Sequence, residues 1–212
     1  MPDVIINGPE GRIEGKYHHS EADYPNIALV LHPHPLYGGT MNNKVVYTAY
    51  HCLAALGFSV LRINFRGVGQ SQGKFDDGTG ELTDAATAFD WLQQHNPVTK
   101  STWIVGFSFG SWVAAQLLMR RPEIKQFILI SPPVAKYDFS FLSPCPTSGL
   151  LIQGNQDSVV KEGDVSNFVS SLIAQKGVKI DYHMINNADH FFREHMDELK
   201  GSITNYTSAH IG

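Results

Sequence analysis

The sequence predicts an α/β fold, in which a mostly parallel, twisted sheet of about seven to eight strands has helices on both faces. Short apolar runs alternate along the chain with longer segments of helical period, and such alternation is typical of parallel sheets. The length of 212 residues and the hydrophobic content of 42% are enough for one sizeable core, and no repeat or linker divides the chain. We therefore expect a single domain over residues 1–212.

Strands are expected where apolar residues form short runs bounded by turn residues. Residues 4–7 and 12–18 flank Gly8-Pro9-Glu10-Gly11, which indicates a hairpin-like turn between two early strands. Residues 27–31 are apolar without interruption, as in a central parallel strand. Further strands are predicted at residues 58–63, 103–105, 127–130, 150–153 and 178–185.

Helices are expected between these strands, where apolar residues recur at helical spacing. Gly57 follows residues 43–56 at the position of a C-terminal helix cap, and Pro122 ends the helix predicted at residues 110–120. Helices are also predicted at residues 81–95, near residues 163–174 and after residue 190. Because parallel sheets bind ligands where their strands end, polar residues just past those ends form the candidate site.

Composition and charge argue against several classes of partner. The formal net charge is −4, with 16 lysine and arginine residues and no basic run, so a nucleic-acid partner is not expected. No apolar stretch reaches the length of a membrane span, and the first residues lack a signal-peptide pattern. Cys52 and Cys145 are not spaced as metal ligands or as a redox pair. We expect a cytoplasmic protein that has no membrane partner.

Three polar residues of complementary chemistry, Ser108, Asp157 and His190, each follow one of the predicted strands. A serine hydroxyl becomes a nucleophile when a neighbouring base takes its proton, and the pKa of histidine suits that task. A buried carboxylate can orient the imidazole and stabilise its charged form. The sequence therefore predicts a catalytic triad assembled from three strand ends.

Ser108 lies in the sequence GFSFG, between a predicted strand and a predicted helix. In this context Gly-x-Ser-x-Gly is typical of the nucleophile elbow, a strained turn that lifts the serine hydroxyl clear of the backbone. Glycine at positions 106 and 110 removes Cβ atoms that would collide with the neighbouring strand and helix. The positive end of the helix also favours a developing negative charge beside the serine. The alternative interpretation is an ordinary turn.

Other residues compete for the two remaining roles. Asp157 could simply cap a turn, and Asp164 is the nearest rival carboxylate, although it stands where a helix is expected to begin. Among the other histidines, His183 lies inside a predicted strand, His95 lies at a helix end, and His195 is expected to face solvent. Asp157 and His190 each follow a strand late in the chain, and this position favours them as the acid and the base.

These stretches resemble the α/β-hydrolase superfamily, specifically its small, bacterial, carboxylesterase-like members related to dienelactone hydrolase. The resemblance covers nearly the whole chain and rests on HPHPLYGGTMNNKVV, INFRGVGQSQG, GFSFG, GNQDSVV and ADHFF. It implies Ser108 as the nucleophile, His190 as the base and Asp157 as the acid, with the backbone N–H of Phe109 as one oxyanion donor. Dienelactone hydrolases carry cysteine at the elbow, so the serine argues against that particular activity.

The second oxyanion donor should come from the loop that follows residues 27–31. Pro33 and Pro35 have no N–H and cannot donate. Alignment with the His-Gly-x loop of relatives favours His34, with Leu36 or Tyr37 as alternatives. The spacing of His32 and His34 also occurs in metal sites, but no cysteine or carboxylate cluster stands beside them in the sequence, so no metal is expected.

Two further loops bear on ligands. GVGQSQG superficially resembles a dinucleotide-binding loop, but more glycines and aspartates follow where a helix should begin, so we expect a structural loop in which Arg66 braces its neighbours. Residues 131–148 contain four prolines and are too short for an inserted cap. An open, shallow site is therefore expected, and its walls are predicted to be Tyr37, Phe107, Phe139, Phe141 and Phe191.

The expected function is hydrolysis of small carboxylic esters through an acyl-enzyme, without a cofactor. A thioesterase or a small peptidase would use the same triad, and a non-catalytic binding protein could keep the same fold. Retention of all three triad residue types argues against the binding protein. No coiled coil or other sequence signal indicates an oligomeric state.

Overall fold

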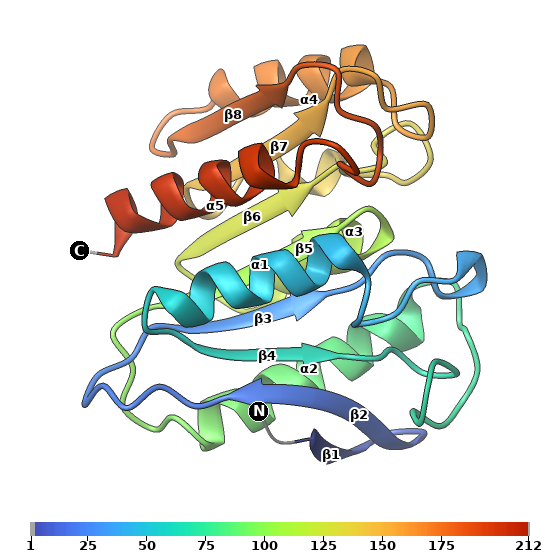
Figure 1. Ribbon diagram of the computed structural model, residues 1–212, viewed down its shortest axis with the longest axis vertical. Coiled ribbons are helices and arrows are strands. Elements are labelled where there is room, and N and C mark those ends of the chain that lie inside the picture. Colours follow the sequence, from blue (N-terminus) through green and yellow to red (C-terminus); the bar gives the residue numbers. More distant parts are fainter. Residues whose placement is uncertain (1–2, 212) are drawn as a thin grey trace.

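The computed structural model describes residues 3–211 and contains one eight-stranded sheet. The strands are β1 (Asp3–Gly8), β2 (Gly11–His18), β3 (Ile27–Leu31), β4 (Ser59–Ile63), β5 (Thr102–Phe107), β6 (Gln126–Ile130), β7 (Gly149–Gly154) and β8 (Ile180–Ile185). They lie in the order β1-β2-β4-β3-β5-β6-β7-β8. Strands β3 to β8 are parallel, whereas β1 and β2 form an antiparallel hairpin at one edge (Figure 1). The predicted fold class is confirmed.

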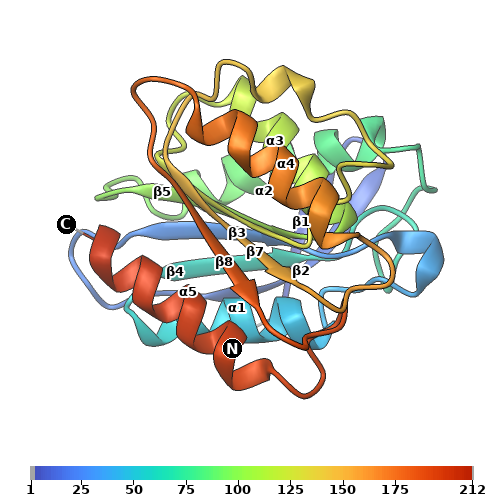
Figure 2. The ribbon, with the colours of Figure 1, turned by 90° about the horizontal axis from the view of Figure 1, so that it is seen from above.

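Helices cover both faces of this sheet. They are α1 (Lys44–Ala55), α2 (Thr79–Gln94), α3 (Phe109–Arg120), α4 (Glu162–Ile173) and α5 (Met196–His210), with 3-10 turns η1 (Pro35–Tyr37) and η2 (Ser140–Leu142). Figure 2 shows α1 and α5 on one face and α2, α3 and α4 on the other. Helices α1 to α4 begin and end within two residues of their predicted bounds, and α5 lies after residue 190 as predicted.

The core consists of two apolar layers, one on each face of the sheet. In β3, Ala28 and Val30 belong to the apolar layer that includes residues of α1 and α5, whereas Ile27, Leu29 and Leu31 belong to the layer that includes residues of α2 and α3. All five residues are at most 1% exposed. The unbroken apolar run of this strand therefore reflects burial on both faces.

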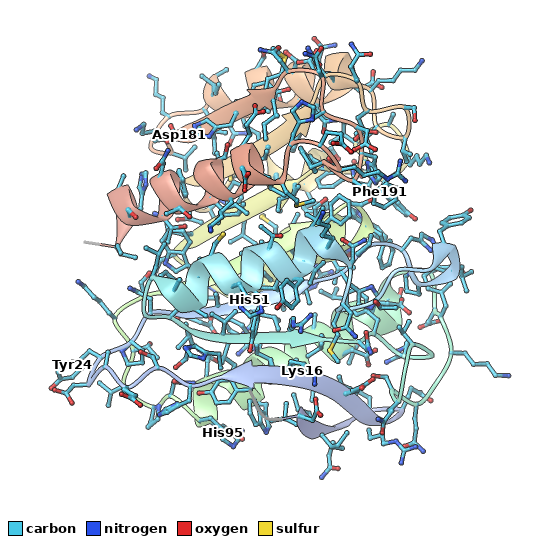
Figure 3. All side chains as sticks on the ribbon, in the orientation of Figure 1. Lys16, Tyr24, His51, His95, Asp181 and Phe191 are labelled. Carbon is cyan, nitrogen blue, oxygen red and sulfur yellow. The ribbon has the colours of Figure 1, made fainter. Side chains whose placement is uncertain are left out.

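The order of the strands determines where the site can form. From β3 the chain crosses to β4 on one side of β3 and then to β5 on its other side. Loops at the carboxyl ends of β3 and β5 consequently turn away from one another, and such a switch point is where open α/β sheets bind ligands. Phe191, which follows β8, also lies at this end of the sheet, toward which the strand arrows point (Figures 1 and 3).

The segment between β6 and β7 contains the short turn η2 and no inserted helical cap in the described part of the chain. This agrees with the prediction made from its four prolines. No helix within residues 3–211 is long and apolar enough to cross a membrane.

Arg66 fixes the glycine-rich loop that follows β4 to helix α2. Its guanidinium makes a bidentate contact with Asp84, with Nη2 2.8 Å from Oδ1 and Nε 3.0 Å from Oδ2. The backbone N–H of Arg66 also donates to Oδ2, at 3.0 Å. The side chains of Arg66 and Asp84 are 7% and 2% exposed, so both charges are largely shielded from water. The predicted bracing role of Arg66 matches these contacts.

We predict that Asp84→Ala lowers the free energy of unfolding by about 3–5 kcal/mol, because it leaves a buried guanidinium without its carboxylate. Urea denaturation of both proteins measures this loss. Asp90→Ala is the matched control on the same helix, since Asp90 is 51% exposed where it pairs with Arg121. The control should cost under about 1 kcal/mol. Equal losses in the two variants would contradict the role assigned to the buried pair.

Candidate active site

Ser108 occupies a sharp turn between β5 and α3. Its backbone dihedral angles are φ 52° and ψ −121°, a strained conformation for a residue with a side chain. A Cβ at Gly106 would lie 2.5 Å from the Cα of Ser111, and one at Gly110 would lie 2.5 Å from the carbonyl oxygen of Leu31. Both positions therefore exclude a side chain, for the steric reason expected from the sequence.

His190 lies between Ser108 and Asp157. Its Nδ1 is 2.7 Å from Oδ2 of Asp157, and its Nε2 is 3.2 Å from Oγ of Ser108. These residues follow β5, β7 and β8, so the structure brings together the three side chains that the sequence singled out. Asp164, the rival carboxylate, lies instead in the first turn of α4.

Several N–H groups hold the Asp157 carboxylate in place. Its Oδ1 accepts hydrogen bonds from the backbone N–H groups of Val159 and Val160, both at 2.8 Å. Its Oδ2 accepts from His190 and from the side-chain amide of Gln153, which is 3.1 Å away. Burial alone would raise the pKa of Asp157, but the hydrogen bonds from His190 and the two valine N–H groups outweigh burial, and the pKa is lowered. Asp157 is therefore held as a carboxylate.

This arrangement sets the tautomer of His190. An ionised carboxylate only accepts hydrogen bonds, so Nδ1 of His190 carries the proton and Nε2 is free to accept one. The acceptor nitrogen faces the hydroxyl of Ser108. The three groups can thus transfer the serine proton to the imidazole while the carboxylate stabilises the resulting positive charge.

Phe109 and His34 line the same cavity as Ser108, and their backbone N–H groups have no acceptor among residues 3–211. Phe109 is the first residue of α3, so its N–H has no partner within the helix, and the N–H of His34 donates to no acceptor among residues 3–211. The N–H groups of Leu36 and Tyr37, the alternatives predicted from the sequence, already donate hydrogen bonds to His34. The N–H of Leu36 donates to Nδ1 of His34 at 3.2 Å, and the N–H of Tyr37 donates to the carbonyl oxygen of His34 at 3.1 Å.

His32 locks the loop that carries His34. Its Nδ1 is 2.6 Å from the carbonyl oxygen of Pro33, and its Nε2 accepts from the N–H of Phe65 at 3.0 Å. Burial lowers the pKa of His32 to about 4, although the hydrogen bond to Pro33 acts in the opposite direction. A neutral imidazole with both nitrogens engaged therefore ties the loop after β3 to the loop after β4.

A cavity of about 520 Å³ opens over Ser108 and His190. Its remaining lining residues come from the loops after β3, β6, β7 and β8 and from the start of α3; they are Pro33, His34, Tyr37, Gly38, Gly39, Asn43, Phe109, Pro133, Lys136, Tyr137, Val159 and Phe191. Of the five predicted wall residues, Tyr37 and Phe191 line this cavity.

The other three predicted wall residues do not line the cavity, and the prediction is corrected for them. Phe107 is 1% exposed and packs beneath the His190 ring, with 5.1 Å between ring centroids. Phe139 is buried against Phe168, and Phe141 stacks on Phe139 outside the cavity. An aromatic residue near a strand end can face either the core or the cavity, and the sequence does not specify which.

Tyr137, Lys136 and Val159 also line the cavity and were not predicted from the sequence. Tyr137 stacks on Trp112 of α3, with 4.4 Å between ring centroids. The prolines at 132 and 133, three residues before Lys136, were the available signal, because they directly follow the carboxyl end of β6, where a site-forming loop is expected.

The ring nitrogens of His32 and His34 are not arranged to bind one metal ion together. Their ring nitrogens contact the different backbone groups described above, and no group of three or more metal-binding side chains occurs within residues 3–211.

The doubly covered parallel sheet, the strained serine turn and the Ser108–His190–Asp157 contacts are together characteristic of α/β serine hydrolases. Residues 30–147 match the model of the alpha/beta hydrolase fold family, and the chain belongs to that family.

Three relatives span nearly the whole chain. An uncharacterised protein of Rickettsia prowazekii is 59% identical over 97% of this chain and 88% of its own length. The structure of a protein of unknown function from Agrobacterium tumefaciens is 51% identical, with a TM-score of 0.95 over 98% of this chain and 95% of that one. A Xanthomonas campestris protein, described as a serine hydrolase without a lid, is 32% identical, with a TM-score of 0.89 over 98% and 94%.

We predict that His32 makes stability depend on pH between about 6.5 and 4. Because the pKa of folded His32 is about 4, the unfolded chain binds a proton first as the pH falls, and the folded state loses about 3 kcal/mol across this window. His32→Gln should remove that part of the slope. Urea denaturation of wild type and variant between pH 7 and pH 4 measures the difference. If the free energy of unfolding of wild type and variant changed in parallel with pH, His32 would not be the source of this pH dependence.

Proposed function

We propose that the protein is a serine hydrolase that cleaves small carboxylic esters through an acyl-enzyme intermediate. The observation that carries the proposal is the pair of hydrogen-bond contacts from Ser108 to His190 and from His190 to Asp157 at the floor of the cavity. Family membership supports the hydrolase class. The ester substrate and the individual residue roles are the proposal.

In the first half-reaction, Oγ of Ser108 attacks the ester carbonyl carbon and its proton passes to Nε2 of His190. The carbonyl oxygen becomes an oxyanion, which the N–H groups of Phe109 and His34 stabilise. As the tetrahedral intermediate collapses, the carbon–oxygen bond to the alcohol breaks and His190 returns the proton to the leaving oxygen. Water then repeats the sequence on the acyl-serine and releases the acid.

Backbone strain supports catalysis over a purely binding role. A serine held at φ 52° and ψ −121° costs about 1–3 kcal/mol, and nothing in a binding function requires that conformation. Cavity size supports small substrates. A volume of about 520 Å³ without a covering cap suits short acyl and alcohol groups.

We predict that the wild type hydrolyses p-nitrophenyl acetate and butyrate faster than the octanoate, because a cavity of about 520 Å³ suits short acyl groups better than long ones. Ser108→Ala should lower kcat by about 10⁴-fold or more, since the nucleophile is lost. Steady-state rates on the three esters measure both effects. An optimum at long acyl chains would contradict the cavity assignment, and unchanged activity in the variant would contradict the nucleophile.

Charge on the cavity wall gives a preference among esters. Lys136 is exposed and makes no ion pair within residues 3–211, and no carboxylate lines the cavity. Asp77 lies near His34 outside the lining and opposes this charge only in part. A negatively charged substituent on the acyl group would therefore be attracted toward Lys136.

We predict that Lys136→Gln lowers the preference for an anionic ester over its neutral counterpart about three- to fivefold. The measurement is kcat/KM for the mono-p-nitrophenyl ester of glutaric acid, divided by that for p-nitrophenyl valerate. Lys176→Gln is the control, because it removes an equal charge from the exposed turn before β8, at the opposite end of the sheet. If the ratio of kcat/KM values fell equally in both variants, the preference would come from the overall charge of the protein and not from the position of Lys136.

A further inference from the structure

Gln153 is a fully buried residue of β7 whose side chain lies beneath the loop that carries Asp157. Its amide nitrogen is 2.9 Å from the carbonyl oxygen of Val160, 3.1 Å from Oδ2 of Asp157 and 3.2 Å from the carbonyl oxygen of Gly154. One amide group thus contacts the beginning, the middle and the end of this loop.

The orientation of the Gln153 amide follows from its neighbours. All three oxygens are acceptors, so the NH₂ group faces them, because the amide oxygen would be repelled there. The amide oxygen Oε1 then points away and is buried, with no hydrogen-bond partner among residues 3–211. A side chain retained only for packing would not bury an unpaired oxygen, and this cost indicates that the NH₂ contacts matter.

We propose that Gln153 is a positioning residue that sets both the orientation and the basicity of the Asp157–His190 pair. Oδ2 of Asp157 accepts from Gln153 and from His190 together. A second donor withdraws negative charge from the oxygen that stabilises the imidazolium, so Gln153 weakens the electrostatic support that Asp157 gives to a protonated His190. The consequence for catalysis rests on the proposed hydrolase function, whereas the effect on His190 does not.

Few other charged groups surround His190. Asp189, its chain neighbour, pairs with the exposed Arg193 at 3.1 Å. Phe107 of β5 and Phe191 present uncharged rings to the imidazole, and Lys136 and His34 line the same cavity. Among the described residues, Asp157 is the charged group in hydrogen-bond contact with His190. A change at Gln153 therefore reaches His190 through Asp157.

The test compares two variants that remove the donor: Gln153→Met, at similar volume, and Gln153→Leu, with a shorter side chain. For Gln153→Met we expect kcat on p-nitrophenyl acetate to fall about tenfold with KM nearly unchanged, and the acidic limb of kcat/KM to move up by about half a pH unit. Gln153→Leu should move the limb by a similar amount, because it removes the same donor.

Asn155→Ala is the matched control. Asn155 joins the acid loop to the histidine loop, since its Oδ1 accepts from the N–H of Asn187 at 2.7 Å and its Nδ2 donates to Asn186 at 3.1 Å, and neither bond involves Asp157. We expect this variant to lower the melting temperature and to leave the acidic limb in place. Loss of activity in Gln153→Met with the limb unmoved would assign Gln153 a merely structural role and overturn the proposal.

NMR titration of the His190 imidazole gives a second readout that needs no substrate. The proposal requires the His190 titration to move to higher pH in Gln153→Met and in Gln153→Leu. Unshifted titration in both variants overturns it, and Gln153→Leu carries the test if Gln153→Met does not fold. Absence of ester turnover in every protein, including wild type, would instead count against the proposed function, while the titration still decides the role of Gln153.

Discussion

The hydrogen bond between His190 and Asp157 is the interaction on which the rest of the site depends. It joins the loop after β7 to the loop after β8 and sets which imidazole nitrogen faces Ser108. Without it, either nitrogen could carry the proton, and the serine would face an acceptor only part of the time. The backbone N–H groups of Val159 and Val160 and the side-chain amide of Gln153 hold the Asp157 carboxylate in the position from which it contacts His190.

Rigid surroundings allow the site to hold strain. Ser108 adopts an unfavourable backbone conformation, and the glycines on either side approach neighbouring backbone too closely for any side chain. The sheet beneath is covered by helices on both faces, and its central strands are fully buried. The packing of this core offsets the free-energy cost of the strained turn at Ser108.

Much of the fold and the three central side chains could be predicted from sequence because the relevant rules are local. A strand followed by GFSFG and a helix identifies Ser108, and strand ends identify Asp157 and His190. The cavity walls depend on loop paths, so Phe107 and Phe139 face the core while Tyr137 faces the cavity. Gln153 gave no signal, because a glutamine ending an apolar run is ordinary until its amide is seen beneath Asp157.

Labelling with a fluorophosphonate, followed by peptide mass spectrometry, tests the central claim most directly, because the reagent reacts only with an activated serine. We expect a single adduct on the peptide that contains Ser108, with labelling greatly slowed in His190→Ala, since the free hydroxyl is a weak nucleophile. An unlabelled protein, an adduct on another serine or an unchanged rate in His190→Ala would contradict the assignment of Ser108 as a nucleophile activated by His190.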